Sequence, residues 1–119
     1  MDLHTQKDFD ALALTMAGVT LVDQWGSRVA KVGDKVFTLH SRENGTASIV
    51  VKVSEESFEI LTALPGIAQA PYFAKRKWVS ITDASPLGPD ELRLYITRSY
   101  ALVAAGLTRK LRAELGIVL

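Results

Sequence analysis

The residues best suited to chemistry stand in one short stretch, residues 71–81, which reads Pro-Tyr-Phe-Ala-Lys-Arg-Lys-Trp-Val-Ser-Ile. Three consecutive cations, Lys75, Arg76 and Lys77, lie between aromatic residues and lead into an apolar, β-prone segment. Cations bind phosphate groups, and aromatic rings stack on nucleobases. No other part of the chain combines charge, aromatic side chains and a structural transition. This stretch is therefore the first candidate for contact with a polyanion.

Further cations flank two expected hairpin turns. Arg28, Lys31 and Lys35 surround the Gly33-Asp34 turn, and Arg42 precedes the Asn44-Gly45 turn. Cationic hairpin tips reach phosphates or groove edges of a duplex, but charged hairpins also protect sheet edges from aggregation, so both interpretations stay open. On the first interpretation the nucleic-acid-binding residues are Arg28, Lys31, Lys35, Arg42, Lys75, Arg76 and Lys77.

The remaining chemistry-bearing residues do not form a catalytic pattern. The two histidines, His4 and His40, have no partners at metal-ligand spacing, and we expect His40 to be exposed on a strand. The Ser99-Tyr100 pair lies on a predicted helix, where the tyrosine hydroxyl is expected to satisfy a backbone group at the edge of the core. No glycine-rich loop joins a strand to a helix. We therefore expect that the protein is not an enzyme and that it has no catalytic residue, cofactor or metal site.

Composition places the chain among single-domain globular proteins. Its 119 residues form one domain, residues 1–119, and its net charge is only +1. The charge is uneven, because residues 1–74 carry six cations and nine anions whereas residues 75–119 carry eight cations and four anions. The absence of cysteine excludes disulfides and thiolate chemistry. No signal peptide or membrane-spanning run is predicted, so we expect a cytoplasmic protein with no membrane partner.

Hydrophobic periodicity and turn residues predict the elements that would position these side chains. A helix is expected over residues 6–17, capped by Thr5, and a second helix is expected from Ser54 to Leu64. A third helix begins at Pro89 and is broken near Gly106, after which Thr108 is expected to cap a final short helix. Four strands precede the second helix, a loop over residues 66–74 follows it, and one strand at residues 78–82 comes next. The order α-β-β-β-β-α-β-α(-α) predicts the α+β class, with an antiparallel sheet of about five strands and helices packed on one face.

The register of the Asn44-Gly45 hairpin is predicted from side-chain alternation. A three-residue loop would place Leu39 opposite Ile49 and Phe37 opposite Val51, with all large apolar residues on one face. A two-residue loop would place Leu39 opposite Val50 and is therefore disfavoured. The other face of this hairpin would then be mixed and half solvated, with Val36, Thr38 and His40 opposite Lys52, Val50 and Ser48.

Several motifs spread over nearly the whole chain make it resemble the MmcQ/YjbR family of small bacterial proteins. The matching segments are Gly18-Val19, Gly33-Asp34-Lys35-Val36-Phe37, Pro71-Tyr72, Lys77-Trp78-Val79, Ser99-Tyr100-Ala101-Leu102-Val103 and Leu107-Thr108-Arg109-Lys110-Leu111-Arg112. Two positions depart from the usual pattern, because Ala17 and Thr108 stand where many relatives have proline. Neither change is expected to alter the fold.

The resemblance implies an α+β fold similar in shape to bacterial frataxin and to the double-wing DNA-binding domain of a phage transcription factor. It implies double-stranded DNA as a partner only by analogy of shape, and it supplies no catalytic motif. Two alternatives remain at this point. One is a protein-interaction or small-ligand module using the mixed face around Val36, His40 and Val50. The other is a frataxin-like metal carrier, for which Asp2, Asp8 and Asp10 are too sparse.

Overall fold

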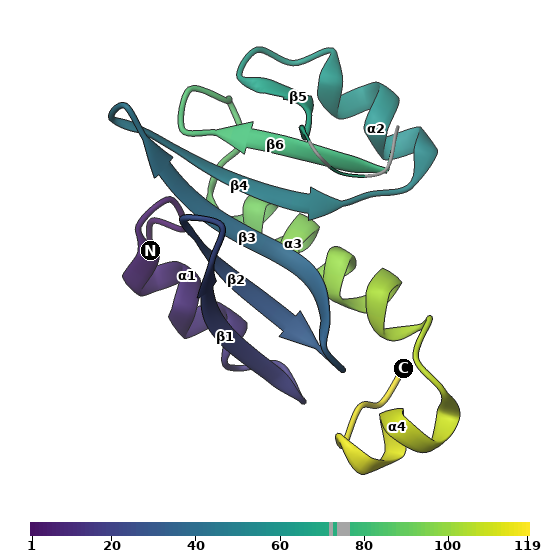
Figure 1. The fold of residues 1–119 in the computed structure, drawn as a ribbon. Helices are drawn as coiled ribbons and strands as arrows, with labels where there is room; N and C mark the ends of the chain where they lie inside the picture. The colour runs from purple at the N-terminus through teal and green to yellow at the C-terminus, as the bar shows by residue number, and fades with distance from the viewer. Residues whose placement is uncertain (72, 74–76) are drawn as a thin grey trace.

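The computed structural model describes residues 1–71, 73 and 77–119. Its helices and strands follow one another in an order close to the predicted one (Figure 1). In chain order they are α1 (Gln6–Ala13), β1 (Val19–Gln24), β2 (Ser27–Val32), β3 (Lys35–Glu43), β4 (Thr46–Lys52), α2 (Glu55–Thr62), β5 (Ile67–Gln69), β6 (Trp78–Thr82), α3 (Pro89–Ala104) and α4 (Arg109–Glu114).

The strands form one antiparallel sheet in the order β1-β2-β3-β4-β6-β5. Helices α1 and α3 lie behind the sheet, and α2 packs against β5 and β6 (Figure 1). The predicted α+β class is therefore confirmed. The sheet has six strands, one more than expected, because Ile67–Gln69 pairs with β6 inside the segment predicted as a loop. We call the sheet face away from α1 and α3 the open face.

Side-chain caps fix the helix starts where the sequence predicts them. The Thr5 hydroxyl accepts a hydrogen bond from the Asp8 amide, and the Ser54 hydroxyl accepts one from the Ser57 amide. The Thr108 hydroxyl accepts one from the Leu111 amide at the start of α4. The first helix ends at Ala13, four residues earlier than predicted. Within the described part of the chain, no helix is both long and apolar enough to span a bilayer.

The register of the β3–β4 hairpin differs from the prediction. Leu39 pairs with Val50, and Asn44-Gly45 is a two-residue turn with φ of 52° and 80°. The reason is a β-bulge: Ala30 pairs with Thr38 and Lys31 pairs with Val36, so Phe37 between them has no partner on β2. The bulge turns Phe37 toward the Tyr100 ring on α3, with ring centroids 5.4 Å apart. Phe37 and Leu39 therefore lie on opposite faces of the sheet. The prediction had placed all large apolar residues of this hairpin on one face.

The prediction that His40, Thr38 and Val50 share a half-solvated face of this hairpin is also wrong. His40 is buried, with its ring 5.5 Å from Phe9 on α1, and Thr38 is fully buried on the same side. Val50 instead lies on the open face opposite Leu39. Helix α1 covers His40 because the amphipathic stripe of α1 packs across β1 to β3, a tertiary contact that strand patterning does not reveal.

The C-terminal helix closes one end of the sheet. Gly33, at φ +55° in the turn between β2 and β3, lies directly under Leu107 and Leu111. A β-carbon built on Gly33 would stand 2.8 Å from two Leu107 methyl carbons. Glycine is therefore required here both for its backbone angle and for the close approach of α4.

Candidate functional site

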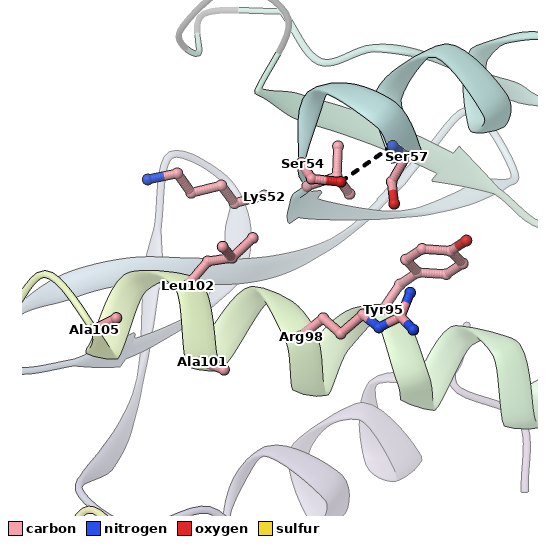
Figure 2. A pocket seen from close by; sticks show the side chains of 9 residues that line it. Lys52, Ser54, Ser57, Tyr95, Arg98, Ala101, Leu102 and Ala105 are labelled. Carbon is pink, nitrogen blue, oxygen red and sulfur yellow. Dashed lines mark hydrogen bonds between the residues drawn. The ribbon is translucent and has the colours of Figure 1, made fainter. Parts of the chain in front are cut away.

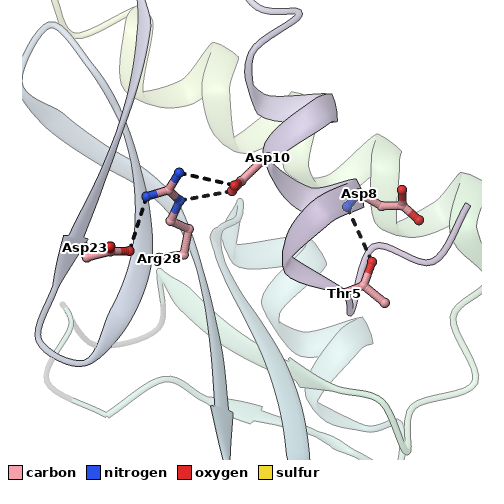
Figure 3. Close-up of polar contacts among 5 residues, drawn as sticks. All are labelled: Thr5, Asp8, Asp10, Asp23 and Arg28. Carbon is pink, nitrogen blue, oxygen red and sulfur yellow. Dashed lines mark hydrogen bonds and ion pairs between the residues drawn. The ribbon is translucent and has the colours of Figure 1, made fainter.

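The Arg28 side chain, a predicted phosphate ligand, is already bound within the protein (Figure 3). Its Nε and Nη2 atoms donate to the two oxygens of Asp10 at 3.1 and 3.2 Å, and its Nη1 atom donates to Asp23 at 3.2 Å. The hydrogen bonds to Asp10 raise the pKa of Arg28. The guanidinium thus joins α1 to the β1–β2 hairpin, with its charge matched by two carboxylates.

The predicted cations divide between two ends of the sheet. Arg28 and Arg42 lie near the β1–β2 and β3–β4 turns, where Gln24 pairs with Ser27 and Glu43 pairs with Thr46. Lys35 and Lys77 lie at the opposite end. No single surface therefore unites the cations of both hairpins. Lys75 and Arg76 lie outside the described residues.

Four adjacent strand positions do bring lysines to one end of the sheet, which we call the lysine end. The register places Lys31 at the end of β2, Lys35 at the start of β3, Lys52 at the end of β4 and Lys77 just before β6. Lys35 and Lys77 are exposed, and Lys31 and Lys52 are half-buried. None of these four lysines forms an ion pair with another described residue. The lysine end thus presents amines from four neighbouring strands.

Two features of the lysine end could not be predicted from the sequence. The sequence does not indicate Lys52 as a phosphate-binding residue, because its position beside the other lysines follows from the β3–β4 and β4–β6 pairings. The exposed Arg109 and Lys110 of α4 lie near this end because Leu107 and Leu111 pack on Gly33. Acidic residues Asp34, Glu55 and Glu56 also occur here, so the charge excess is moderate.

The hydroxyls of Ser99 and Tyr100 form hydrogen bonds with the backbone. The buried Ser99 hydroxyl donates to the carbonyl of Phe37 in the bulge and accepts from the Lys52 amide at 2.8 Å. The Tyr100 hydroxyl donates to the carbonyl of Ala17 at 2.6 Å, as the sequence predicts. Burial raises the pKa of Tyr100. Both hydroxyls therefore complete the hydrogen bonding of the core.

The two histidines meet beneath the N-terminal segment. His40 Nε2 lies 2.6 Å from the His4 carbonyl oxygen, and His4 Nε2 lies 3.4 Å from the Ile81 carbonyl oxygen. Burial lowers the pKa of His4, against the opposing effect of Asp2 and Asp83. Over residues 1–71, 73 and 77–119, no three His, Asp or Glu side chains are grouped as metal ligands would be.

A pocket of about 370 Å³ separates the start of α2 from α3 (Figure 2). Its polar groups do not converge. The Ser54 hydroxyl caps α2, the Arg98 guanidinium lies 5.7 Å from the Tyr95 ring, and the Lys52 amine is turned away from both. The arrangement provides no set of donors aimed at one ligand.

Comparison with solved structures shows the same fold in two bacterial proteins. The Deinococcus radiodurans protein DR2400, which carries the DUF419 domain, aligns with a TM-score of 0.85 and 25% identity over 96% of this chain and 89% of its own. A crystal structure of a Pseudomonas syringae protein aligns with a TM-score of 0.70 and 24% identity over 82% of this chain and 97% of its own.

The sequence comparisons define the family. No curated protein matches the chain. The YjbR family model matches residues 14–102, which include β1 to β6 and most of α3. This match agrees with the motifs noted in the sequence and with the shared fold of the solved structures. The chain belongs to the YjbR family.

Proposed function

We propose that the protein is a non-enzymatic nucleic-acid-binding module, and that its lysine end contacts the backbone phosphates of double-stranded DNA. The observation that carries the proposal is the convergence of Lys31, Lys35, Lys52 and Lys77 from four adjacent strand positions. Lysine amines bind phosphates as mobile point charges, which suits contact without base recognition. In sequence, Lys75 and Arg76 directly precede Lys77 and would add to this cation set.

The lack of a catalytic role is part of the same proposal. The hydroxyls of Ser99 and Tyr100 and the rings of His4 and His40 all have backbone partners inside the fold. A general base or nucleophile must instead face a substrate. The moderate charge of the lysine end favours weak binding that depends strongly on salt.

The test is a titration of fluorescent duplex DNA at several salt concentrations. Four lysine–phosphate contacts correspond to a slope of log K against log[salt] of about −3.6. The variant K35E/K77E should lose at least about tenfold in affinity at low salt, with a slope about 2 units shallower.

The matched control is K7E/R42E, which changes the net charge by the same amount. Arg42 pairs with Ala47 beside the β3–β4 turn, at the opposite end of the sheet from Lys35 and Lys77. Its side chain contacts the carbonyl of His4, three residues before Lys7 at the start of α1. This variant should lose much less affinity than K35E/K77E. Equal losses in both variants would show that net charge, not the lysine end, governs binding, and no binding of wild type at low salt would reject the function.

A further inference from the structure

A groove of about 720 Å³ runs across the open face of the sheet, apart from the lysine end. Leu39 of β3 and Val50 of β4 form its floor. Serine hydroxyls from four strands surround this apolar floor: Ser27, Ser41, Ser48 and Ser80. A mainly apolar cavity of this size with a few polar groups has the general character of a small-molecule site.

Aromatic rings stand at two sides of the groove. Phe73 lies on one side, where it packs on Trp78 with ring centroids 4.7 Å apart. Trp25 lies on the other side, in the turn between β1 and β2, and is 68% exposed. An exposed indole at the rim of a groove is available to a ligand in a way that the buried Trp78 is not.

The backbone at Trp25 is unfavourable for its side chain. Trp25 and Gly26 form a two-residue turn with φ of 56° and 71°. A bulky residue in the left-handed region costs about 1 kcal/mol or more. The same chain uses Asn44-Gly45, the favoured pair, in the corresponding turn between β3 and β4. Local backbone preference therefore does not account for tryptophan at the β1–β2 turn.

Charge selects among the ligands that this groove fits. Among its described lining residues, Glu43 is the sole charged one. Glu43 ends β3, at the same end of the sheet as Trp25. A cation placed there would gain from the carboxylate and from the face of the indole ring, whereas an anion would be repelled.

We propose that the open-face groove binds a small aromatic amine. The ammonium group would lie between Glu43 and Trp25, and the aromatic ring would rest on Leu39 and Val50 toward Phe73. Since the Ser27 and Ser41 hydroxyls bond to each other at 2.6 Å, the hydroxyls of Ser48 and Ser80 would bind polar substituents. This site is separate from the lysine end, so it does not depend on DNA binding.

The test compares two probes with the same ring and opposite charge, tryptamine and indole-3-acetate. Each is titrated into ¹⁵N-labelled protein while the Trp25 indole N–H resonance, assigned by its absence in W25F, is followed. We expect tryptamine to shift this resonance and to bind at least about tenfold more tightly than indole-3-acetate. The variant E43Q should remove most of that preference, whereas E56Q, the same change at the start of α2, should keep it.

The variant W25N separates ligand contact from folding. It gives this turn the Asn-Gly pair of the β3–β4 turn, so the protein should be at least as stable as wild type in urea. It should bind tryptamine at least about tenfold more weakly, because it lacks the indole. The proposal is overturned if neither probe shifts the Trp25 resonance, if both bind equally, or if W25N binds tryptamine as wild type does.

Discussion

At the scale of single residues, the hydroxyl of Ser99 replaces a hydrogen bond that a regular β-ladder would form between β3 and β4. The bulge at Phe37 interrupts regular pairing, and Ser99 accepts from Lys52 on one strand and donates to Phe37 on the next. A partly buried amide and a buried carbonyl therefore depend on one side chain from α3. Such groups are costly when they are left without partners.

The variant S99A should lower the free energy of unfolding by about 2–4 kcal/mol, since it leaves the buried Phe37 carbonyl and the partly buried Lys52 amide unsatisfied. Urea denaturation followed by circular dichroism measures this loss. T97A, at an exposed position two residues earlier in the same helix, should change stability by less than about 1 kcal/mol. A loss in S99A no larger than that in T97A would show that the bridge has little energetic role.

His4 makes stability depend on pH in a defined direction. Its pKa in the folded protein lies below the ordinary value of 6.5, chiefly because it is buried. As pH falls below 6.5, the unfolded chain takes up a proton at His4 while the folded chain does not, so stability falls until the folded pKa is reached. The slope from this group is at most about 1.4 kcal/mol per pH unit.

Unfolding free energies measured between about pH 7.5 and about pH 5 test this dependence. The variant H4Q keeps a donor for the Ile81 carbonyl but cannot titrate in this range. Its stability should fall less steeply over the acidic part of the range than that of wild type. Parallel curves for the two proteins would remove His4 as a source of the pH dependence.

At the scale of elements, the close packing of the β2–β3 turn against Leu107 and α4 limits which residue can stand at position 33. Gly33 has φ +55°, and its α-carbon faces Leu107 and Leu111 with no room for a methyl group. The C-terminal helix has only six residues and buries none of them fully, so its position depends on such contacts at its start. The same packing holds Arg109 and Lys110 near the lysine end.

The variant G33A should lower the free energy of unfolding by about 2–4 kcal/mol, from left-handed strain plus overpacking against Leu107. G26A is the matched control, because Gly26 has φ +71° but no atom within 4 Å of a built β-carbon. It should cost only the strain, about 1–2 kcal/mol. Thermal unfolding of both proteins measures the difference, and equal losses would show that α4 simply moves aside.

At the scale of the whole molecule, local patterns predicted most of the fold. Caps at Thr5, Ser54 and Thr108 depend on neighbours within three residues, so the sequence contains the whole signal. The β3–β4 register was mispredicted because the bulge at Phe37 responds to packing by Tyr100, more than sixty residues away. Strand β5 was missed because three residues that gain stability only by pairing with β6 have no periodicity.

The candidate sites also depend on contacts between distant parts of the chain, which local patterns do not predict. Lys31, Lys35 and Lys77 were selected from their residue types, but Arg28 was given the same role although Asp10 and Asp23 bind it. Those partners lie on two other elements, and only the fold brings them together. The open-face groove could not be predicted, because the bulge decides that Leu39 and Val50 share that face.

The bridge at Ser99 also has a consequence for the order of folding. The strands β1 to β4 are joined by three two-residue turns, so their pairing closes short loops and can form early. The contacts of Ser99 span 47 and 62 residues, so we expect α3 to dock on a meander that already exists. Such late contacts act on the unfolding rate, and S99A should shorten the lifetime of the native state while leaving the folding rate nearly unchanged.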